Sequence, residues 1–177
     1  DGKCDPWGRF WAGSMAYDFA AGAGSLWRVN ADFSCVRQRQ GLTISNGLAW
    51  SQDRGTLYLI DSPTRQVLAF PLTSSGDFSG EPTPCITIPK AWDALPDGMC
   101  IDAEGMLWIA LFGGGAVTRW DPISGQRLER LELPCRQVTS CCFGGPDLDQ
   151  LLITTARRGM DPAAIKAEPL AGGLFEA

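Results

Sequence analysis

The 177-residue sequence predicts an all-β protein made of repeated antiparallel sheets, the architecture of β-propeller blades. Three observations support this fold class. A hairpin pattern recurs along the chain, its copies are spaced by roughly 45 to 50 residues, and only strand signals lie between them, whereas helical repeats would show a 3.6-residue apolar period. The 21 glycines and 12 prolines also suit a chain with many turns.

Each hairpin pattern consists of an apolar strand, a polar turn and a second apolar strand. The copies cover residues 1–12, 45–61, 96–110 and, more weakly, 139–155. The second strands carry aromatic or aliphatic markers, which are Trp11, Tyr58, Trp108 and Ile153. Because this spacing is that of propeller blades, we expect about four blades, each with about four strands.

Short β-forming runs between the hairpins predict the outer strands. They cover residues 25–29, 66–70, 116–120 and 127–131. Residues 161–167 are the only stretch with helical character, and Pro162 and Pro169 keep it short. No linker interrupts residues 1–177, which we expect to form one partial propeller domain.

The two ends of the sequence fall within the repeat pattern. The first residue lies inside a hairpin, and the last residues begin another strand. Because a propeller must close to remove its sheet edges, we expect an arc of a larger ring that is incomplete at both ends.

The charge balance limits the possible partners. A net charge of −5 and a pI near 4.7 argue against nucleic acids and anionic membranes, which attract an excess of Lys and Arg. No apolar run reaches the roughly 18 residues that span a bilayer. The seven cysteines form no regular framework, so we expect reduced, structural thiols and a soluble, cytoplasmic protein.

The sequence contains no histidine. This excludes Ser-His-Asp and Cys-His catalysis and histidine-ligated zinc. Any hydrolysis must therefore depend on carboxylates, on a metal ion, or on both.

Three oxygen-bearing side chains, Asp1, Asn46 and Asp97, each stand immediately before a glycine in successive repeats. Innermost strands of neighbouring blades converge on the propeller axis, so these residues could form a site for a hard divalent cation, with the glycines allowing tight backbone turns. The alternative interpretation is that Asn-Gly and Asp-Gly simply mark turns before strands.

Several motifs resemble the regucalcin family, also called senescence marker protein-30 or gluconolactonase. They are residues 1–9, Ile44-Ser45-Asn46-Gly47-Leu48-Ala49-Trp50, Pro96-Asp97-Gly98-Met99-Cys100-Ile101-Asp102, 139–145 and Gly159-Met160-Asp161-Pro162. The resemblance covers essentially the whole chain. It implies a six-bladed propeller with one divalent cation (Ca²⁺, Zn²⁺, Mn²⁺ or Mg²⁺) and hydrolysis of sugar lactones.

Residue roles can be carried over by position. The resemblance implies that Asn46 and Asp97 bind the metal and that Asp97 also acts as the catalytic acid and base. Asp18, after Gly13-Ser14-Met15-Ala16-Tyr17, stands where the family has a substrate-binding glutamate. The family's glutamate metal ligand has no counterpart here.

We therefore expect a metal-dependent lactonase whose partner is a small sugar lactone, with little or no activity in the 177-residue chain itself. Two alternatives stay open: a calcium-binding or regulatory propeller without catalysis, and hydrolysis of a different ester. The sequence does not identify the lactone, the metal or the oligomeric state.

Overall fold

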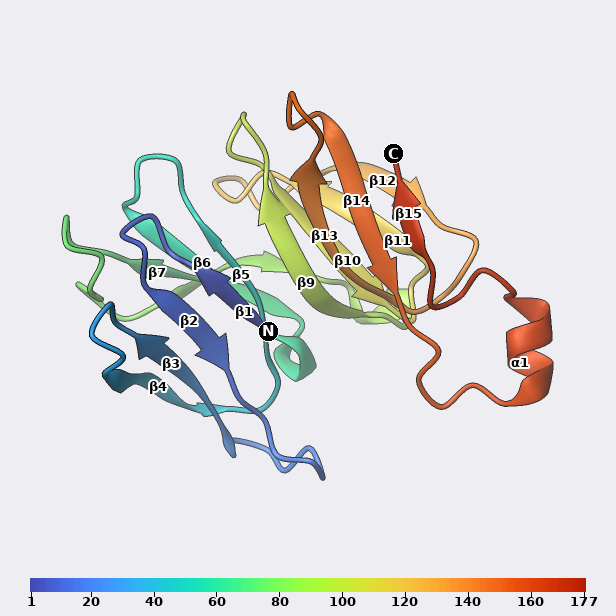
Figure 1. The fold of residues 1–177 in the computed structure, drawn as a ribbon, viewed down its shortest axis with the longest axis horizontal. Coiled ribbons are helices and arrows are strands. Elements are labelled where there is room, and N and C mark those ends of the chain that lie inside the picture. The colour runs from blue at the N-terminus through green and yellow to red at the C-terminus, as the bar shows by residue number, and fades with distance from the viewer. The chain divides into compact units, whose positions relative to one another are not determined.

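A computed structural model describes residues 1–177 and consists almost entirely of β-strands. Fifteen strands form four antiparallel sheets, and within each sheet the strands follow one another in sequence order (Figure 1). This up-and-down order is that of propeller blades. The prediction of an all-β, propeller-type chain with about four blades is confirmed.

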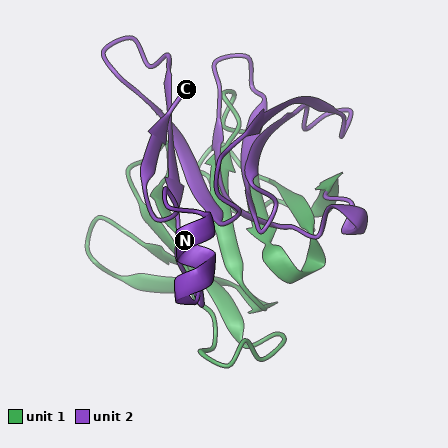
Figure 2. Cartoon of the chain, turned by 90° about the vertical axis from the view of Figure 1, so that its right-hand side faces the viewer, with its two compact units in different colours: residues 1–87 green, residues 88–177 purple.

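The chain divides into two compact units, residues 1–87 and 88–177 (Figure 2). The first unit contains two four-stranded sheets. One is formed by β1 (Gly2–Cys4), β2 (Phe10–Gly13), β3 (Gly24–Val29) and β4 (Cys35–Leu42). The other is formed by β5 (Ser45–Trp50), β6 (Thr56–Asp61), β7 (Gln66–Pro71) and β8 (Thr83–Thr87), with a 3-10 turn at Ser62–Thr64.

The second unit contains a four-stranded and a three-stranded sheet. The larger sheet is formed by β9 (Leu95–Ile101), β10 (Leu107–Phe112), β11 (Ala116–Trp120) and β12 (Arg127–Glu132), preceded by a 3-10 turn at Lys90–Trp92. The smaller is formed by β13 (Val138–Gly144), β14 (Gln150–Thr155) and β15 (Leu174–Glu176). The helix α1 (Pro162–Ala167) lies where a short helix was predicted, and no helix has the length and apolarity of a membrane span.

In the second and third sheets burial falls from the second strand to the fourth, and the fourth strand of the first sheet is also exposed. In β6 and β10 most side chains are buried, whereas β4 and β12 are largely exposed. The outer strand β12 is rich in charge, and its Arg130 pairs with Glu132 at 2.6 Å. Charged residues on an outer strand discourage pairing with another chain.

Each unit has its own apolar core. In the first unit, one buried cluster consists of Trp11, Leu26, Leu42, Leu48, Trp50, Leu57, Leu59 and Phe70. In the second, a buried cluster consists of Cys100, Ala110, Val117, Val138, Cys141, Leu151 and Ile153. Both cores contain marker residues of the repeated hairpin, so the repeat in the sequence reflects repeated burial of the same strand face.

A buried aspartate closes the first hairpin of the first sheet. The carboxylate of Asp5 accepts hydrogen bonds from the Trp11 indole at 2.8 Å, from the Arg9 guanidinium at 2.6 Å, and from the backbone N–H groups of Trp7 and Arg9. Burial alone would raise the pKa of Asp5, but these donors outweigh it and hold the pKa below its ordinary value.

Asp102 closes the third sheet in the same way. Its carboxylate accepts hydrogen bonds from the Trp108 indole at 2.9 Å, the Arg119 guanidinium at 2.7 Å and the backbone N–H groups of Glu104 and Met106. In both sheets the indole lies six positions after the aspartate. The turn, its carboxylate and its aromatic partner thus recur as one unit.

Replacing Asp5 by asparagine should lower the free energy of unfolding by about 1.5 to 3 kcal/mol near neutral pH, because the buried group loses charge-assisted hydrogen bonds. The pKa of Asp5 is lowered in the folded chain, so its ion contributes stability above the unfolded pKa and loses it as the pH falls through the folded pKa. Urea unfolding followed by tryptophan fluorescence should therefore show a shallower acid dependence in the variant.

The matched control is Asp53→Asn. Asp53 lies in the corresponding turn of the second sheet, where its exposed carboxylate accepts a hydrogen bond from the N–H of Gly55 at 2.9 Å. Exposed hydrogen bonds contribute little, so this variant should unfold nearly as the unsubstituted chain does. Equal stability and equal acid dependence of Asp5→Asn and the unsubstituted chain would contradict the role given to Asp5.

Candidate metal and catalytic site

Asn46 is the second residue of β5 and is half-buried. Its side-chain nitrogen donates a hydrogen bond to the hydroxyl of Ser62 at 2.9 Å. Ser62 is itself only 3% exposed and begins the 3-10 turn that follows β6. Because the amide nitrogen of Asn46 is engaged in this way, the amide oxygen is the atom left to bind a cation.

The end of β6 fixes the chain that leads into β5. The buried carboxylate of Asp61 accepts hydrogen bonds from the backbone N–H groups of Thr43 and Ile44, the latter at 2.9 Å. The backbone N–H of Ser62 donates to the carbonyl oxygen of Ile44 at 3.2 Å. Ser62, which binds the amide of Asn46, thus also anchors the chain that leads into its strand, together with Asp61.

Asp97 is the third residue of β9 and is also half-buried. The ladder with β10 pairs Pro96 with Leu111 and Met99 with Ile109, and its register shifts between these pairs. Asp97 and Gly98 thus face a single residue, Ala110. This two-against-one arrangement is a β-bulge, a feature that often re-aims a side chain beside an active site.

Asn46 lies in an equivalent bulge. The ladder of β5 with β6 pairs Ser45 with Asp61 and Leu48 with Leu59, with a register shift between them. Asn46 and Gly47 therefore face Ile60 alone. The interpretation that Asn-Gly and Asp-Gly mark turns before strands is wrong, because both pairs lie inside strands.

Asp1 does not share this position, so the predicted equivalence of three residues is wrong for Asp1. It precedes β1, and β1 pairs with β2 without a register shift. Asp1 lies four residues before the turn residue Asp5, whereas Asn46 and Asp97 lie five residues before Ser51 and Asp102, which open the corresponding turns. By this count Asp1 corresponds to Gly47 and Gly98 and not to Asn46 and Asp97.

Close packing explains the glycine after Asp97. A Cβ atom at Gly98 would collide with the side chain and backbone of Ser140 on β13. Neither Gly47 nor Gly98 has a positive φ, so the expectation that these glycines allow tight turns is wrong. Gly98 is required because β9 lies against β13, and this contact fixes the backbone that carries Asp97.

Asp18 lies in the loop between β2 and β3, in the same unit as Asn46. Its side chain is exposed and accepts a hydrogen bond from the N–H of Ala20 at 3.1 Å. The next residue, Phe19, has a left-handed backbone with φ of 58°. Asp18 is thus accessible to a polar ligand, while Asp97 belongs to the other unit.

The donor chemistry of Asn46 and Asp97 fits a hard divalent cation. Both side chains offer oxygen atoms, the ligands that Ca²⁺, Mg²⁺ and Mn²⁺ prefer. No group of three or more Asp, Glu or Cys side chains in this chain has metal-site geometry. Asn46 offers an amide oxygen and Asp97 offers carboxylate oxygens as ligands.

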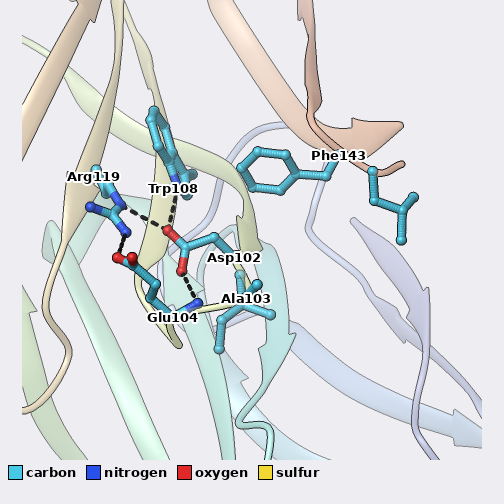
Figure 3. Close-up of a pocket in the computed structure, with 8 residues that line it drawn as sticks. Asp102, Ala103, Glu104, Trp108, Arg119 and Phe143 are labelled. Carbon is cyan, nitrogen blue, oxygen red and sulfur yellow. Dashed lines mark hydrogen bonds and ion pairs between the residues drawn. The ribbon is translucent and has the colours of Figure 1, made fainter. Parts of the chain in front are cut away.

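An apolar cavity of about 520 Å³ lies elsewhere in the second unit (Figure 3). Trp108 and Phe143 form part of its wall, with ring centroids 5.9 Å apart. Arg119 is bound there by Asp102 at 2.7 Å, by Glu129 at 3.0 Å and by Glu104. None of the predicted site residues lines this cavity, and its charged groups are already paired with one another.

Sequence reasoning missed Ser62 and the Asp102–Arg119 pair. The repeated spacing from Asp5 to Trp11 and from Asp102 to Trp108 was a usable signal for the turn carboxylates. No comparable signal marks Ser62, because it follows Asn46 by 16 positions and reaches it only through the pairing of β5 with β6.

Replacing Gly98 by alanine should destabilise the chain by about 1 to 3 kcal/mol, because the added methyl group overpacks the contact with Ser140. Chemical unfolding measures this loss, and a second substitution, Ser140→Gly, should recover part of it. Gly80→Ala is the control, since its Cβ would meet only the Pro71 ring, at 3.2 Å. A Gly98→Ala chain as stable as the control would contradict the close approach.

Comparison with known proteins places the chain among lactonase-like and calcium-binding relatives. Residues 1–157 match the family model described as the SMP-30/gluconolactonase/LRE-like region. The chain is 43% identical to the Bacillus subtilis protein named "Putative sugar lactone lactonase YvrE", covering 100% of this chain and 60% of that protein. It is 41% identical to regucalcin of Homo sapiens, covering 99% of this chain and 60% of that one.

Solved structures agree with these relatives. Regucalcin of Agrobacterium tumefaciens, described as a calcium-binding protein, superposes with a TM-score of 0.93 at 35% identity over 99% of this chain and 59% of its own. A gluconolactonase of Xanthomonas campestris superposes with a TM-score of 0.71 at 26% identity, over 87% of this chain and 52% of its own. The chain thus spans about 60% of the length of the curated relatives.

Proposed function

Because the chain belongs to the SMP-30/gluconolactonase/LRE-like family, we propose that it is part of a divalent-metal-dependent hydrolase of sugar lactones. The observation that carries this proposal is the pair of equivalent bulges. They give Asn46 and Asp97, two oxygen donors, the same position in the first strands of their sheets. Membership of the family supports lactone hydrolysis in general. The assignment of Asn46 and Asp97 as the metal ligands of this chain is part of our proposal.

In this proposal the amide oxygen of Asn46 and the carboxylate of Asp97 hold the cation. When bound, a divalent cation supplies Lewis-acid chemistry at a carbonyl oxygen. The Ser62 hydroxyl keeps the amide of Asn46 oriented, and the packing of Gly98 on Ser140 keeps the backbone of Asp97 in place. The exposed carboxylate of Asp18 can accept hydrogen bonds from sugar hydroxyl groups.

Asp97 also moves the proton in the proposed reaction. Water adds to the lactone carbonyl carbon and gives up a proton to the Asp97 carboxylate. The bond between the carbonyl carbon and the ring oxygen then breaks, and Asp97 returns the proton to the departing ring oxygen. The product is the open-chain hydroxy acid. With no histidine in the chain, a carboxylate is the side chain best suited to this role.

Replacing Asp97 by asparagine in the full-length protein should lower kcat by about 100- to 10,000-fold, the usual loss when a general acid-base group is removed. Hydrolysis of gluconolactone in a pH-stat, with each divalent metal in turn, measures this change. The matched control is Asp93→Asn, because Asp93 is an exposed acid in the same unit with a left-handed backbone that asparagine tolerates.

Undiminished turnover by Asp97→Asn would show that another group carries the proton. The unsubstituted protein also tests the alternative of a calcium-binding propeller without catalysis, which the description of the Agrobacterium relative favours. Binding of Ca²⁺ without turnover of any lactone under any metal would support that alternative. Turnover of simple esters in preference to lactones would instead favour a different ester hydrolase.

Replacing Ser62 by alanine should weaken metal binding by about 10- to 100-fold, the usual effect of removing a group that orients a metal ligand. Isothermal titration with the metal alone measures the dissociation constant. Ser45→Ala is a matched control, since Ser45 is also 3% exposed and neighbours Asn46, but its hydroxyl has no hydrogen-bond partner. Equal losses of affinity in the two variants would contradict the role of Ser62.

A further inference from the structure

Two cysteines from different sheets meet in the second unit. The Sγ atoms of Cys100 on β9 and Cys141 on β13 lie 3.7 Å apart. Both residues are buried, with 6% and 4% of their surface exposed. The Cys141 thiol also lies 3.4 Å from the carbonyl oxygen of Trp108, to which it can donate a hydrogen bond. The structure contains no disulfide.

The two thiols are brought together by the same packing that constrains Asp97. Gly98 lies against Ser140, so β9 and β13 approach more closely there than side chains on both strands would allow. Cys100 follows Gly98 by two positions, and Cys141 follows Ser140 by one. The sulfur atoms therefore face each other across a gap that the neighbouring backbone contact holds narrow.

We propose that Cys100 and Cys141 form an oxidisable dithiol, which closes to a disulfide between β9 and β13 when a peroxide reaches it. A disulfide has a sulfur–sulfur bond of about 2.0 Å, so the two sulfur atoms must approach by about 1.7 Å for the bond to form. The proposal concerns the thiols alone and does not depend on lactone hydrolysis.

The reaction balances with hydrogen peroxide as the oxidant. One thiolate attacks a peroxide oxygen, the O–O bond breaks, and a sulfenic acid and water are formed. The second thiol then attacks the sulfenic sulfur, the S–O bond breaks, and a second water leaves as the disulfide forms. The two thiols lose two electrons in total, and the peroxide gains them. A dithiol reductant reverses the change by thiol–disulfide exchange.

The cross-link would join two neighbouring sheets three residues beyond Asp97. A disulfide restricts the unfolded chain, so oxidation should raise the melting temperature of the protein, and reduction should return it to the starting value. The loop closed between residues 100 and 141 is long, which increases this restriction of the unfolded chain. In the folded chain the bridge would also fix the spacing between the two sheets.

The test is peptide mapping of the full-length protein after hydrogen peroxide treatment. Oxidation continues until the exposed thiols of Cys4, Cys35 and Cys142 are consumed. The protein is then denatured, and N-ethylmaleimide blocks the thiols that have not reacted. Trypsin places Cys100 in peptide 91–119 and Cys141 in peptide 137–157. We expect these two peptides to be linked under non-reducing conditions and separated after reduction.

Cys142 provides the matched control, because it shares the second peptide but is exposed. The link should persist in Cys142→Ser and disappear in Cys141→Ser and Cys100→Ser. Two results would overturn the proposal: a link that disappears in Cys142→Ser, or peptides that remain unlinked once the exposed thiols are consumed. Whether the two peptides become linked is measured in the unsubstituted protein alone. The test therefore does not depend on whether the Cys100→Ser and Cys141→Ser variants fold.

Discussion

Closure of the first hairpin in each sheet is the interaction on which the remaining structure depends. In the first and third sheets a carboxylate performs it, buried at Asp5 and half-buried at Asp102, and withdrawing such a charge from water is favourable only because four donors surround it. Asp5 directly follows β1 and its donors lie in the turn and on β2, while Asp102 directly follows β9 and its donors lie in the turn and on β10 and β11. Each carboxylate thus ties the end of the first strand to the start of the second. In the third sheet the bulge at Asp97 then follows at a set distance along β9.

The candidate site is therefore a consequence of strand register and not of a special loop. A bulge offers one extra residue whose side chain leaves the regular alternation of the sheet. Asn46 and Asp97 use this position in two different sheets, and each has a neighbour that limits its freedom. For Asn46 the neighbour is a hydroxyl from the end of the next strand, and for Asp97 it is the close approach of β13 to Gly98.

The sequence predicted the hairpins, their period and the correspondence of Asn46 with Asp97, because all three depend on local pattern. It failed for Asp1, since an acid followed by glycine looks the same in the sequence whether the acid lies four or five residues before the turn. The contacts of Ser62 with Asn46 and of Cys100 with Cys141 were also out of reach. They join residues 16 and 41 positions apart, and only strand pairing and sheet packing bring such residues together.

The second sheet closes its first turn without a buried charge. Ser51 replaces the aspartate there, and its hydroxyl accepts a hydrogen bond from the backbone N–H of Thr56 at 2.9 Å. Tyr58 takes the place of the tryptophan, so the acid and its indole donor are exchanged together. A hydroxyl does not titrate in acid, whereas the carboxylates of Asp5 and Asp102 do. Acid would therefore act on the sheets unevenly: in the first and third it protonates the carboxylate at the centre of the turn, whereas in the second it reaches only the exposed Asp53, to which Ser51 donates a hydrogen bond.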